Sequence, residues 1–578
     1  AVVEQVQLQG HTLMVDGRPA VFLPEAPTRF VVSSFLQGDT AGLVDKGRME
    51  LEAGRGRDRA GLSQVALVYE VGAGQTIRVA MPLEPKGRPR FARLRRRRGA
   101  SRVPTPDVVG LESARSTAEQ WTNRLHKEGM RVELPDSKLQ SAIDANRAFL
   151  LLFHDGKGIK AGPFTYPRFR FRDAAYQVAA LDRWGFHREA EEVLRSYPER
   201  QRRDGLFDGQ PNEWDSVGAA IWTIAEHYRL TGDREFTETL VPSVRRGSQW
   251  LAKTLHRRRR AGPGLDGLLP AGLSAEHLGP FDYYYWDNFW AVRGLQDAVH
   301  LLRMVQDEEG TAECERARAD LRTALFESVE RAALRIGRRV IAAGPGRGMD
   351  AGMIGSLVSV WPLQLLAPSN PWVVVTLNAL REEFLVGDAI YQGVAHTGLG
   401  TYLTLQLGFT ELEAGDPRAW DRFRWLLDAS TPTFTWPEAI HPSLGTGCMG
   451  DGHQGWASAD FLSFVRNVLV RDTREGGVAL LTLLPPEWEG YDVRVNDAPT
   501  HHGRLSFELS WRDETPLLSW EFEGEGVQVT APGLDPRWST TERAGEAKLA
   551  PSGLVEAGPA VPFGTGRRRR RRTLWIAP

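Results

Sequence analysis

The spacing of apolar residues changes twice along the chain. Residues 1 to about 130 contain short runs in which apolar residues recur at every second position, at 2–8, 20–23, 63–71 and 76–82, with Gly, Asp and Pro between them. Such alternation is typical of strands with one buried face. The pattern predicts an antiparallel β-sandwich for this part of the chain.

A helical period begins at about Ser137, where SKLQSAIDANRAFLLLF carries apolar residues three and four positions apart. About twelve such segments follow one another up to about Arg471, and short polar turns alternate with long loops rich in Gly, Pro and aromatic residues. Twelve helices paired as six hairpins predict an (α/α)6 barrel, a toroid whose long loops lie at one mouth.

The strand pattern returns after Asp472, in YDVRVND, GRLSFELSW and LLSWEFEGEGVQVTA. The sequence therefore predicts a multidomain protein in which a central all-α toroid lies between two β domains. The expected boundaries are 1–130 for the N-terminal β-sandwich, 131–474 for the helical barrel and 475–578 for the C-terminal β domain.

Charge and composition exclude several classes of partner. The 578 residues include 72 Lys and Arg against 73 Asp and Glu, so a formal net charge of −1 provides no overall attraction to nucleic acid or anionic lipid. No uninterrupted apolar run approaches the ~18 residues of a membrane-spanning helix. We therefore expect no nucleic-acid or membrane partner, and we interpret the arginine runs at 95–98, 257–260 and 567–572 as solvated loop segments.

The cysteine content and the first residues of the sequence indicate a cellular compartment. The two cysteines, Cys314 and Cys448, provide no disulfide framework, which fits a reducing compartment. The chain begins with a strand-like alternation and lacks the basic and apolar regions of a signal peptide. Both observations favour a cytoplasmic protein.

The aromatic residues indicate a kind of ligand. Several of the 18 tryptophans lie in loops beside glycine and acidic residues, as well as in apolar stripes. The apolar face of a sugar ring packs on an aromatic plane, while its hydroxyls need polar partners. This combination predicts a sugar-binding site in the long loops, although a core role also explains any single tryptophan.

Two loops offer sugar ligands close to a helix start. The first ends in FRFRDAAY, and the second contains NEWDSVGAA. We expect Arg172, Asp173, Trp214 and Asp215 to contact substrate, because adjacent donors and acceptors match neighbouring hydroxyls. The alternative is that the two aspartates only cap helices.

A third loop, AEHLGPFDYYYWDNFWAVRGL, concentrates aromatic and acidic residues before a helix. Asp287 lies between aromatic neighbours, and partial desolvation raises a carboxyl pKa toward the range of a general acid. We assign it the proton-donor role, with Glu276 as the next candidate and helix capping as the alternative. Glu276, Tyr285 and Trp286 are expected to bind substrate.

The last long loop, TFTWPEAIHPSLGTGCMGDGHQGWASAD, supplies a second carboxylate. Glu438 is the candidate general base, and a solvated loop glutamate is its alternative interpretation. Trp436, His453 and Trp456 are expected to contact the sugar. Glycoside hydrolysis needs such a pair, one carboxyl group to protonate the leaving oxygen and one to activate water or attack directly.

Other chemistries find less support in the sequence. It contains no Walker loop, no dinucleotide fingerprint and no GxSxG elbow, and its histidines lack the spacing of a zinc site. We therefore expect no cofactor and an oligosaccharide as the substrate.

These motifs resemble those of the six-hairpin glycosidases, especially the glucoamylase-like family (glycoside hydrolase family 15) and its relatives, the trehalases and the glucosidase I family. The resemblance rests on FRFRDAAY, where Arg170 stands in place of the family's tryptophan, on YYYWDNFWAVRGL and on TWPEAIHP. It implies that Arg172 and Asp173 hold the terminal sugar. It also implies inverting exo-hydrolysis of α-glucosidic bonds by Asp287 and Glu438, with the carboxyl groups about 6.5 to 9.5 Å apart.

Two further hypotheses remain open from the sequence. The same barrel could support phosphorolysis, which needs one catalytic acid, or a uronate lyase that uses Tyr and His. A non-catalytic glycan-binding protein would also present aromatic residues, but binding alone does not call for acidic residues in every long loop.

Overall fold

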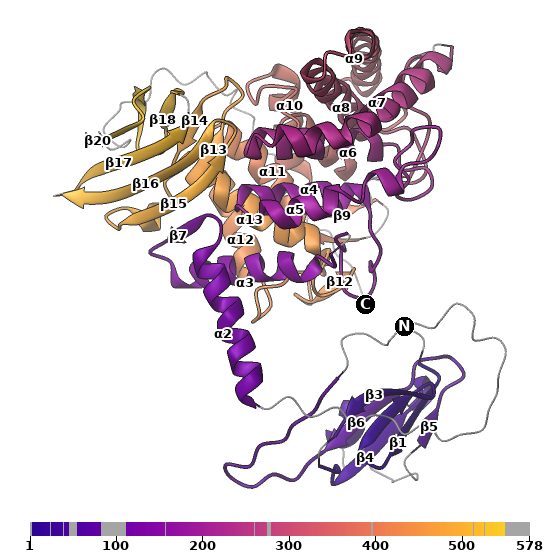
Figure 1. Cartoon of the computed structure of the whole chain (residues 1–578). Coiled ribbons are helices and arrows are strands. Elements are labelled where there is room, and N and C mark those ends of the chain that lie inside the picture. Colours follow the sequence, from indigo (N-terminus) through magenta and orange to yellow (C-terminus); the bar gives the residue numbers. More distant parts are fainter. Residues whose placement is uncertain are drawn as a thin grey trace, which may run out of the picture. The chain divides into compact units, whose positions relative to one another are not determined.

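The computed structural model separates the chain into two compact units, Ala1–Arg124 and Leu125–Pro578 (Figure 1). The structure describes residues 3–23, 25–37, 40–45, 55–81, 111–156, 158–258, 260–273, 279–394, 397–512, 514–524 and 526–549. Among the helices in these ranges, none is both long and apolar enough to cross a membrane.

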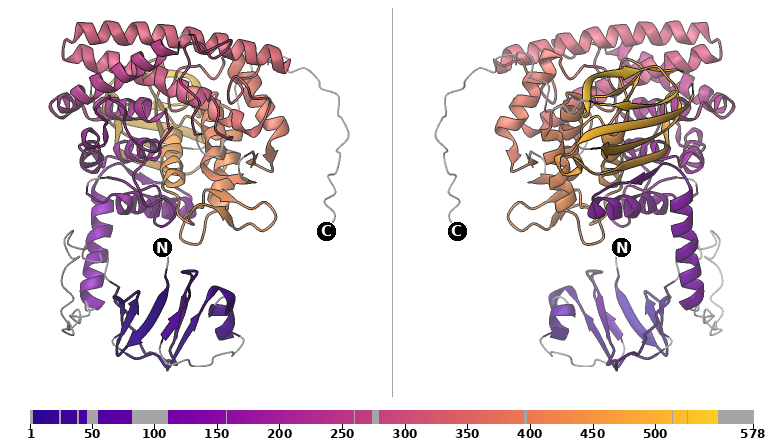
Figure 2. Two further views of the ribbon diagram at one scale, coloured as in Figure 1. Left: turned by 90° about the vertical axis from the view of Figure 1, so that its right-hand side faces the viewer. Right: turned by 90° about the vertical axis from the view of Figure 1, so that its left-hand side faces the viewer.

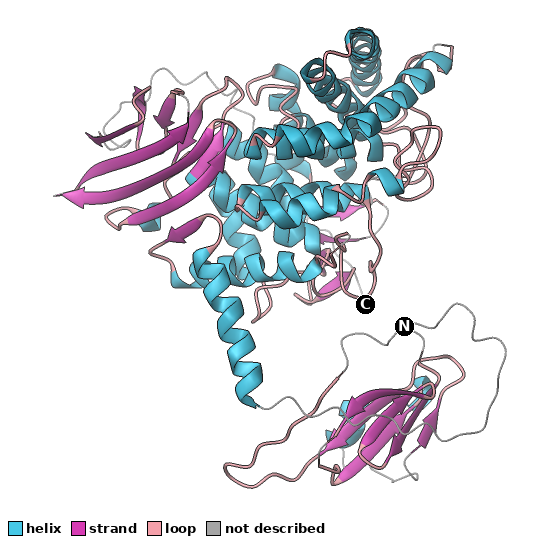
Figure 3. Ribbon diagram, in the orientation of Figure 1, coloured by secondary structure: helices cyan, strands magenta, loops and turns pink. Residues whose placement is uncertain are grey.

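The first unit contains two antiparallel sheets (strands in Figure 3). Val6, Leu13 and Phe30 are buried together, so the two sheets share one apolar core. One sheet has the order β3-β2-β1-β5 and is formed by Gln5–Gln9 (β1), Thr12–Val15 (β2), Arg18–Phe22 (β3) and Arg55–Arg57 (β5). The other pairs Arg29–Ser33 (β4) with Gln64–Val68 (β6).

One expected strand is missing from this unit. Within 76–81, the described part of the predicted run 76–82, only an isolated bridge joins Ala80 to Phe22. The unit's short helices are Phe35–Gln37 (η1) and Thr40–Asp45 (α1), and Leu111–Lys127 (α2) follows them in the chain.

The second unit is mainly helical, and one set of its helices is buried almost throughout. Each of these inner helices follows a long loop, and every residue of α4 and α13 is buried. The inner helices are Phe171–Arg183 (α4), Ser216–Thr231 (α6), Tyr285–Met304 (α8), Ala351–Ser359 (η4, a 3₁₀ helix), Thr401–Glu413 (α11) and Gly455–Leu469 (α13).

The remaining helices alternate with the inner ones along the chain and are only partly buried. These outer helices are Ser137–Phe153 (α3), His187–Leu194 (α5), Arg234–Arg257 (α7), Glu308–Ile336 (α9), Pro371–Glu383 (α10) and Arg418–Asp428 (α12). A short 3₁₀ turn, Pro198–Arg200 (η2), follows α5. The eleven α-helices and η4 in the described part of 137–469 agree with the helical core expected from the sequence.

Contacts link the inner helices in a closed order. Helix α4 packs on α6, α6 on α8, α8 on η4, η4 on α11, α11 on α13, and α13 on α4. Glycine permits the closest of these approaches, because a Cβ atom at Gly218 would lie 2.2 Å from the carbonyl oxygen of Trp290, and one at Gly294 would lie 2.6 Å from the Cα of Gly218. Helices α6 and α8 therefore pack backbone to backbone.

Side-chain caps occur in both sets of helices: Asp350 caps the inner helix η4, and the outer helices α5 and α12 begin without one. Asp136, Asp233, Asp307 and Asn370 cap the outer helices α3, α7, α9 and α10. By contrast, α4, α6, α8, α11 and α13 begin without a side-chain cap. The amino ends of these inner helices therefore direct their partial positive charge at whatever side chains lie in front of them.

Two sheets lie at the C-terminal end of the second unit (yellow in Figure 2), and strands β13 to β15 contact the inner helices α4, α6 and α13. One sheet is formed by Arg131–Glu133 (β7), Val493–Thr500 (β15), Gly503–Arg512 (β16), Thr515–Gly524 (β17) and Ala544–Lys548 (β20). The other is formed by Val470–Asp472 (β13), Val478–Leu480 (β14), Val529–Ala531 (β18) and Asp535–Thr540 (β19), and a 3₁₀ turn, Pro486–Trp488 (η5), follows β14. β14 and β18 pair in parallel, and the other pairs in these two sheets are antiparallel. Sheets near both ends of the described chain agree with the predicted β regions.

A small antiparallel sheet organises the loops before α11 and α13. It is formed by Leu385–Val386 (β8), Ala389–Gly393 (β9), Thr397–Gly400 (β10), Ala439–Ile440 (β11) and Gly447–Met449 (β12). Gly400 pairs with Ala439. This register places Glu438, just before β11, beside the first residues of α11.

Candidate active site

A cluster of buried polar side chains joins the amino ends of α4, α6 and α8. Arg172 Nε donates to Asp215 Oδ2 at 2.5 Å, and the indole Nε1 of Trp286 donates to the same oxygen at 2.8 Å. All three residues are at most 3% exposed. The structure therefore brings together three of the predicted sugar ligands through direct hydrogen bonds.

Asp215 occupies the N-cap position of α6, yet its side chain makes no capping hydrogen bond. Its carboxylate is bound by Arg172 and Trp286 instead. Asp173 and Asp287 each lie in the first turn of their helices, which also start without a side-chain cap. The capping alternative therefore does not explain any of the three aspartates.

Asp173 and Glu213 extend this cluster. Burial raises the pKa of Asp173 to about 7; the cations Arg170 and Arg172 oppose the rise, and the carboxylates Glu213 and Glu438 add to it. Burial also raises the pKa of Glu213, against the attraction of Arg172 at 3.5 Å and with the repulsion of Asp215. The buried guanidinium of Arg172 therefore favours the charged forms of both Asp173 and Glu213.

Asp287 is the most isolated acid of the cluster. It is 1% exposed, and neither carboxyl oxygen has a hydrogen-bond partner among the residues that the structure describes. Burial raises its pKa well above the usual range, and the nearby carboxylates Asp215 and Glu213 raise it further, while Arg172 opposes them. An aspartate in this environment keeps its proton to a higher pH than a solvated aspartate does, which suits proton transfer.

Glu438 lies in a different environment, because hydroxyl groups bind both of its carboxylate oxygens. Tyr166 donates to Oε2 at 2.8 Å, and Tyr402 donates to Oε1 at 3.1 Å. The backbone is held as well: the hydroxyl of Thr401 donates to the carbonyl oxygen of Pro437 at 2.8 Å. Glu438 is 2% exposed, so it is not a solvated loop glutamate.

The loop that carries Tyr166 is anchored by Asp451. The backbone N–H groups of Phe164 and Thr165 donate to its carboxylate at 2.7 to 2.8 Å. These hydrogen bonds contribute to lowering the pKa of Asp451, although burial opposes the shift. Asp451 therefore holds the loop before α4 against the loop before α13, and it positions the Tyr166 hydroxyl over Glu438.

Trp456 connects Glu438 with the other aromatic residues of the cluster. Its ring stacks on Tyr402 at 4.6 Å and on Tyr176 at 4.2 Å, and it lies 6.1 Å from Trp286. Its indole Nε1 donates to Asp460 Oδ2 at 3.0 Å. Burial raises the pKa of Asp460 well above the usual range, and its hydrogen bond with the indole fixes the Trp456 ring.

Four of the predicted substrate contacts make other interactions. Trp214 stacks on Trp250 and donates to the carbonyl oxygen of Ala271, and Tyr285 bonds Ser328 of α9. Trp436 is fully buried and donates to the carbonyl oxygen of Leu426. The ring of His453 packs edgewise on Phe149 and Phe153, and burial lowers its pKa to about 4. Glu276, the second candidate acid, lies outside the described residues.

Sequence reasoning missed several members of the cluster. Tyr402 is an ordinary member of the apolar helix GTYLTLQLGF, and Asp460 lies four residues after Trp456 in an equally apolar helix. Nothing in these stretches distinguishes them. Tyr166 and Glu213 carried a signal, because both lie in aromatic, glycine-rich or acidic loops beside predicted ligands.

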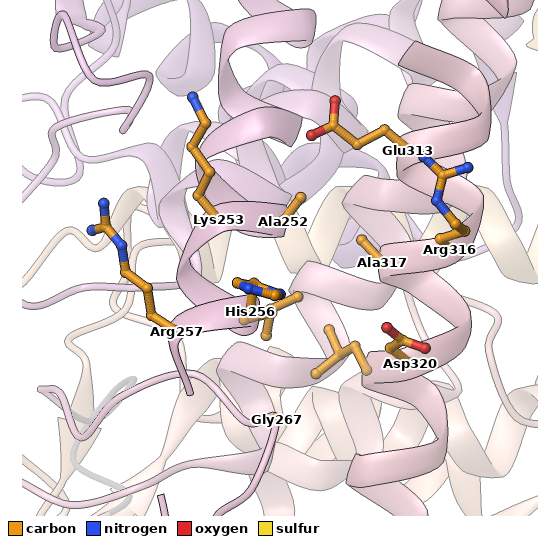
Figure 4. A pocket seen from close by; sticks show the side chains of 11 residues that line it. Ala252, Lys253, His256, Arg257, Gly267, Glu313, Arg316, Ala317 and Asp320 are labelled. Carbon is orange, nitrogen blue, oxygen red and sulfur yellow. The ribbon is translucent and has the colours of Figure 1, made fainter. Parts of the chain in front are cut away.

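A surface groove of about 570 Å³ between α7 and α9 has a different character (Figure 4). Lys253, His256 and Arg257 of α7 lie along one side of it, and Glu313 and Asp320 of α9 lie along the other. It contains none of the predicted site residues, and its charged groups lie on exposed helix faces. We therefore place the candidate site at the amino ends of the inner helices.

Comparisons with known proteins bear on the fold of the chain. No family model matches the chain. An uncharacterized glycosyl hydrolase of Methanocaldococcus jannaschii is 25% identical over a match that covers 57% of this chain and 56% of that protein, so the match spans about half the length of the relative.

Two solved structures share the fold. A bacterial glucoamylase complexed with acarbose has a TM-score of 0.51 at 10% identity, over 81% of this chain and 75% of its own. An α-L-rhamnosidase from Dictyoglomus thermophilum has a TM-score of 0.50 at 11% identity, over 73% and 49%. The predicted resemblance to six-hairpin glycosidases is confirmed at the level of the fold.

Proposed function

We propose that the protein is an inverting, exo-acting glycoside hydrolase that cleaves α-glucosidic bonds of oligosaccharides. The observation that carries the proposal is a contrast between two buried carboxyl groups near the amino ends of the inner helices. Asp287 lacks hydrogen-bond partners among the described residues and has a raised pKa, whereas Glu438 accepts hydrogen bonds from two tyrosines. One group is suited to give up a proton and the other to accept one.

In the proposed reaction Asp287 is the general acid. Its buried position keeps the carboxyl group neutral until the glycosidic oxygen comes within hydrogen-bond distance, and proton transfer then accompanies cleavage of the bond. Negative charge develops on Asp287 as the proton leaves. Arg172, the cation that opposes the pKa rise of Asp287, stabilises that charge.

Glu438 is the proposed general base. Tyr166 and Tyr402 fix the plane of its carboxylate by binding one oxygen each. A carboxylate oxygen has more than one lone pair, so an oxygen that accepts from a tyrosine can also accept from a water molecule. Glu438 would remove a proton from that water as it attacks the anomeric carbon from the face opposite the leaving oxygen.

The terminal sugar is proposed to bind between these two groups. Arg172, Asp173 and Asp215 provide donors and acceptors for its hydroxyl groups. Trp286 provides aromatic surface, and its indole N–H is already bound to Asp215. Trp456 is 1% exposed and stacks on Tyr176 and Tyr402, so it supports the site through these rings. Fixed rings lose little conformational freedom when a sugar binds, which favours tight recognition of one end of a chain.

The proposed function goes with a proposed arrangement of the helices and the β domains. We propose that the inner and outer helices form an (α/α)6 toroid within residues 131–474, with β domains at 1–130 and 475–578 of the sequence. The strands β7 and β13, at the two ends of the helical segment, pair with strands of the C-terminal β domain. The closed order of contacts among the six inner helices supports the toroid. The long loops before these helices would then form the mouth, and the other ends would face the C-terminal strands.

A lyase or a glycan-binding protein fits the site less well. His453, one of the histidines available to a lyase, packs on two phenylalanines and has a lowered pKa. A phosphorylase needs only one catalytic acid, which would leave the two-tyrosine support of Glu438 without a purpose. A binding protein gains nothing from burying an unpaired acid such as Asp287.

Turnover of a panel of α-glucosides by the wild type and by Glu438→Gln tests the proposal. We expect release of glucose by the wild type and a loss of kcat of about 10² to 10⁴-fold in the variant, with substrate binding retained. Phosphate-dependent turnover or an unsaturated product would favour the phosphorylase or the lyase. Tight binding without turnover by the wild type would favour a glycan-binding protein.

A further inference from the structure

A second cluster of buried charged groups lies where the carboxyl ends of the inner helices meet the C-terminal strands. It lines a cavity of about 20 Å³ with residues from α4, α6, α8, α11, α13 and the turn after β15. None of these residues takes part in the proposed reaction. A water molecule needs roughly 10 to 15 Å³, so the cavity accommodates one small species and excludes a phosphate or a sugar.

The cavity carries an excess of positive charge. Four arginines line it, Arg183, Arg293, Arg466 and Arg471, against three carboxylates. Three of the arginines have a carboxylate of their own at 2.7 to 2.9 Å: Glu226, Asp472 and Glu413.

The fourth arginine, Arg293, has no carboxylate of its own. It shares its carboxylate, Asp297, with Arg229, and Arg229 also bonds Glu226. These five guanidinium groups therefore face four carboxylates, and one positive charge is left over.

One guanidinium of this cluster is incompletely bound. Arg466 is 1% exposed, and one terminal nitrogen donates to Asp472 and to the carbonyl oxygen of Pro499, each at 2.7 Å. Its Nε atom is buried and has no partner among the described residues. A buried donor of a charged group that lacks an acceptor is strongly unfavourable, so an acceptor is expected beside this Nε atom.

We propose that the cavity binds one small monovalent anion, of the chloride type. The anion would accept hydrogen bonds from arginine N–H groups and balance the excess charge. It would also link α13 to the turn after β15, because Arg466 and His501 both line the cavity and both bind Asp472. Its expected effect is on the stability of the second unit, independent of the proposed hydrolysis.

Crystals of the full chain grown without halide and then soaked in sodium bromide test the site directly. The expected result is an anomalous bromide peak in the cavity beside Arg466. A cavity that contains only water at saturating bromide, or peaks confined to the surface, would overturn the proposal.

Thermal unfolding in solution provides an independent measurement. Replacing sodium gluconate by sodium chloride at constant ionic strength should raise the unfolding midpoint by about 1 to 3 °C. Asn467→Asp places a fourth carboxylate in the cavity and should abolish this increase, whereas the matched control Asn378→Asp on α10 should retain it. Equal midpoints in the two salts for the wild type would contradict anion binding, whether or not the variants fold.

Discussion

The hydroxyl of Tyr402 donates to Oε1 of Glu438 at 3.1 Å, and both side chains are 2% exposed. Tyr402 lies in the first turn of α11, and Glu438 lies just before β11. The pairing of β10 with β11 brings the two segments together. The fold thus fixes the orientation of the proposed base from a helix that carries no recognisable motif.

Tyr402→Phe removes this hydrogen bond and keeps the ring that stacks on Trp456. We expect kcat to fall by about 10- to 150-fold with little change in KM, because a lost hydrogen bond to a charged group is worth about 1.5 to 3 kcal/mol. Steady-state kinetics on the best α-glucoside would show this. An unchanged kcat would remove Tyr402 from the positioning of Glu438.

Asp287→Asn tests the proposed acid through its dependence on the leaving group. Cleavage of a glycosidic bond should fall by about 10² to 10⁴-fold, whereas a glycosyl fluoride, whose leaving group needs no proton, should lose much less. In the wild type, kcat should decline as pH rises through the raised pKa of Asp287, since only the protonated form donates. The same leaving-group pattern in Glu213→Gln would instead identify Glu213 as the acid.

Gly450→Ala tests how closely the last long loop packs on the base. Gly450 has a φ of +71°, and an added Cβ would lie 2.9 Å from the Cβ and 3.0 Å from Oε2 of Glu438. Gly445, in the same loop, has a φ of +65° and open space around it. Both variants should lose about 1 kcal/mol of stability from the backbone strain. Only Gly450→Ala should also lose kcat, so equal kcat values would argue against this packing.

Asp173 should make stability depend on pH. Burial raises its folded-state pKa to about 7, above its value of about 3.9 in the unfolded chain. The unfolded state therefore releases its proton first, and the stability contributed by this group is lost as pH rises from about 4 to about 7.

Asp173→Asn removes this dependence. As pH rises from 5 to 8, the free energy of unfolding of the variant should increase relative to that of the wild type by on the order of 1 to 3 kcal/mol. The variant should also bind sugar more weakly. Urea unfolding at several pH values would measure the change in free energy. A constant difference across this range would show that Asp173 does not titrate as proposed.

The sequence predicts the helices and the motifs near their first residues, because apolar residues recur along the chain at the spacing of helical turns. Arg172, Asp215, Trp286 and Asp287 all lie at or next to the first turn of an inner helix, where long loops meet apolar runs. Their grouping follows from the parallel arrangement of those helices.

The sequence does not predict which way each side chain in these motifs points. Tyr285 and Trp286 are neighbours in sequence, yet Tyr285 bonds α9 while Trp286 bonds Asp215, since successive helical residues point about 100° apart. Trp436 lies two residues from Glu438 but donates to Leu426 in the core. Tyr166 and Tyr402 reach Glu438 from segments 272 and 36 residues away, a proximity that only tertiary structure creates.

Proton NMR of the first product formed by the wild type tests the central claim most directly. With an α-glucosidic disaccharide or oligosaccharide, a single displacement by water predicts that β-glucose appears first and mutarotates to the α form later. Initial release of α-glucose would contradict the assignment of Glu438 as a general base and indicate a retaining mechanism.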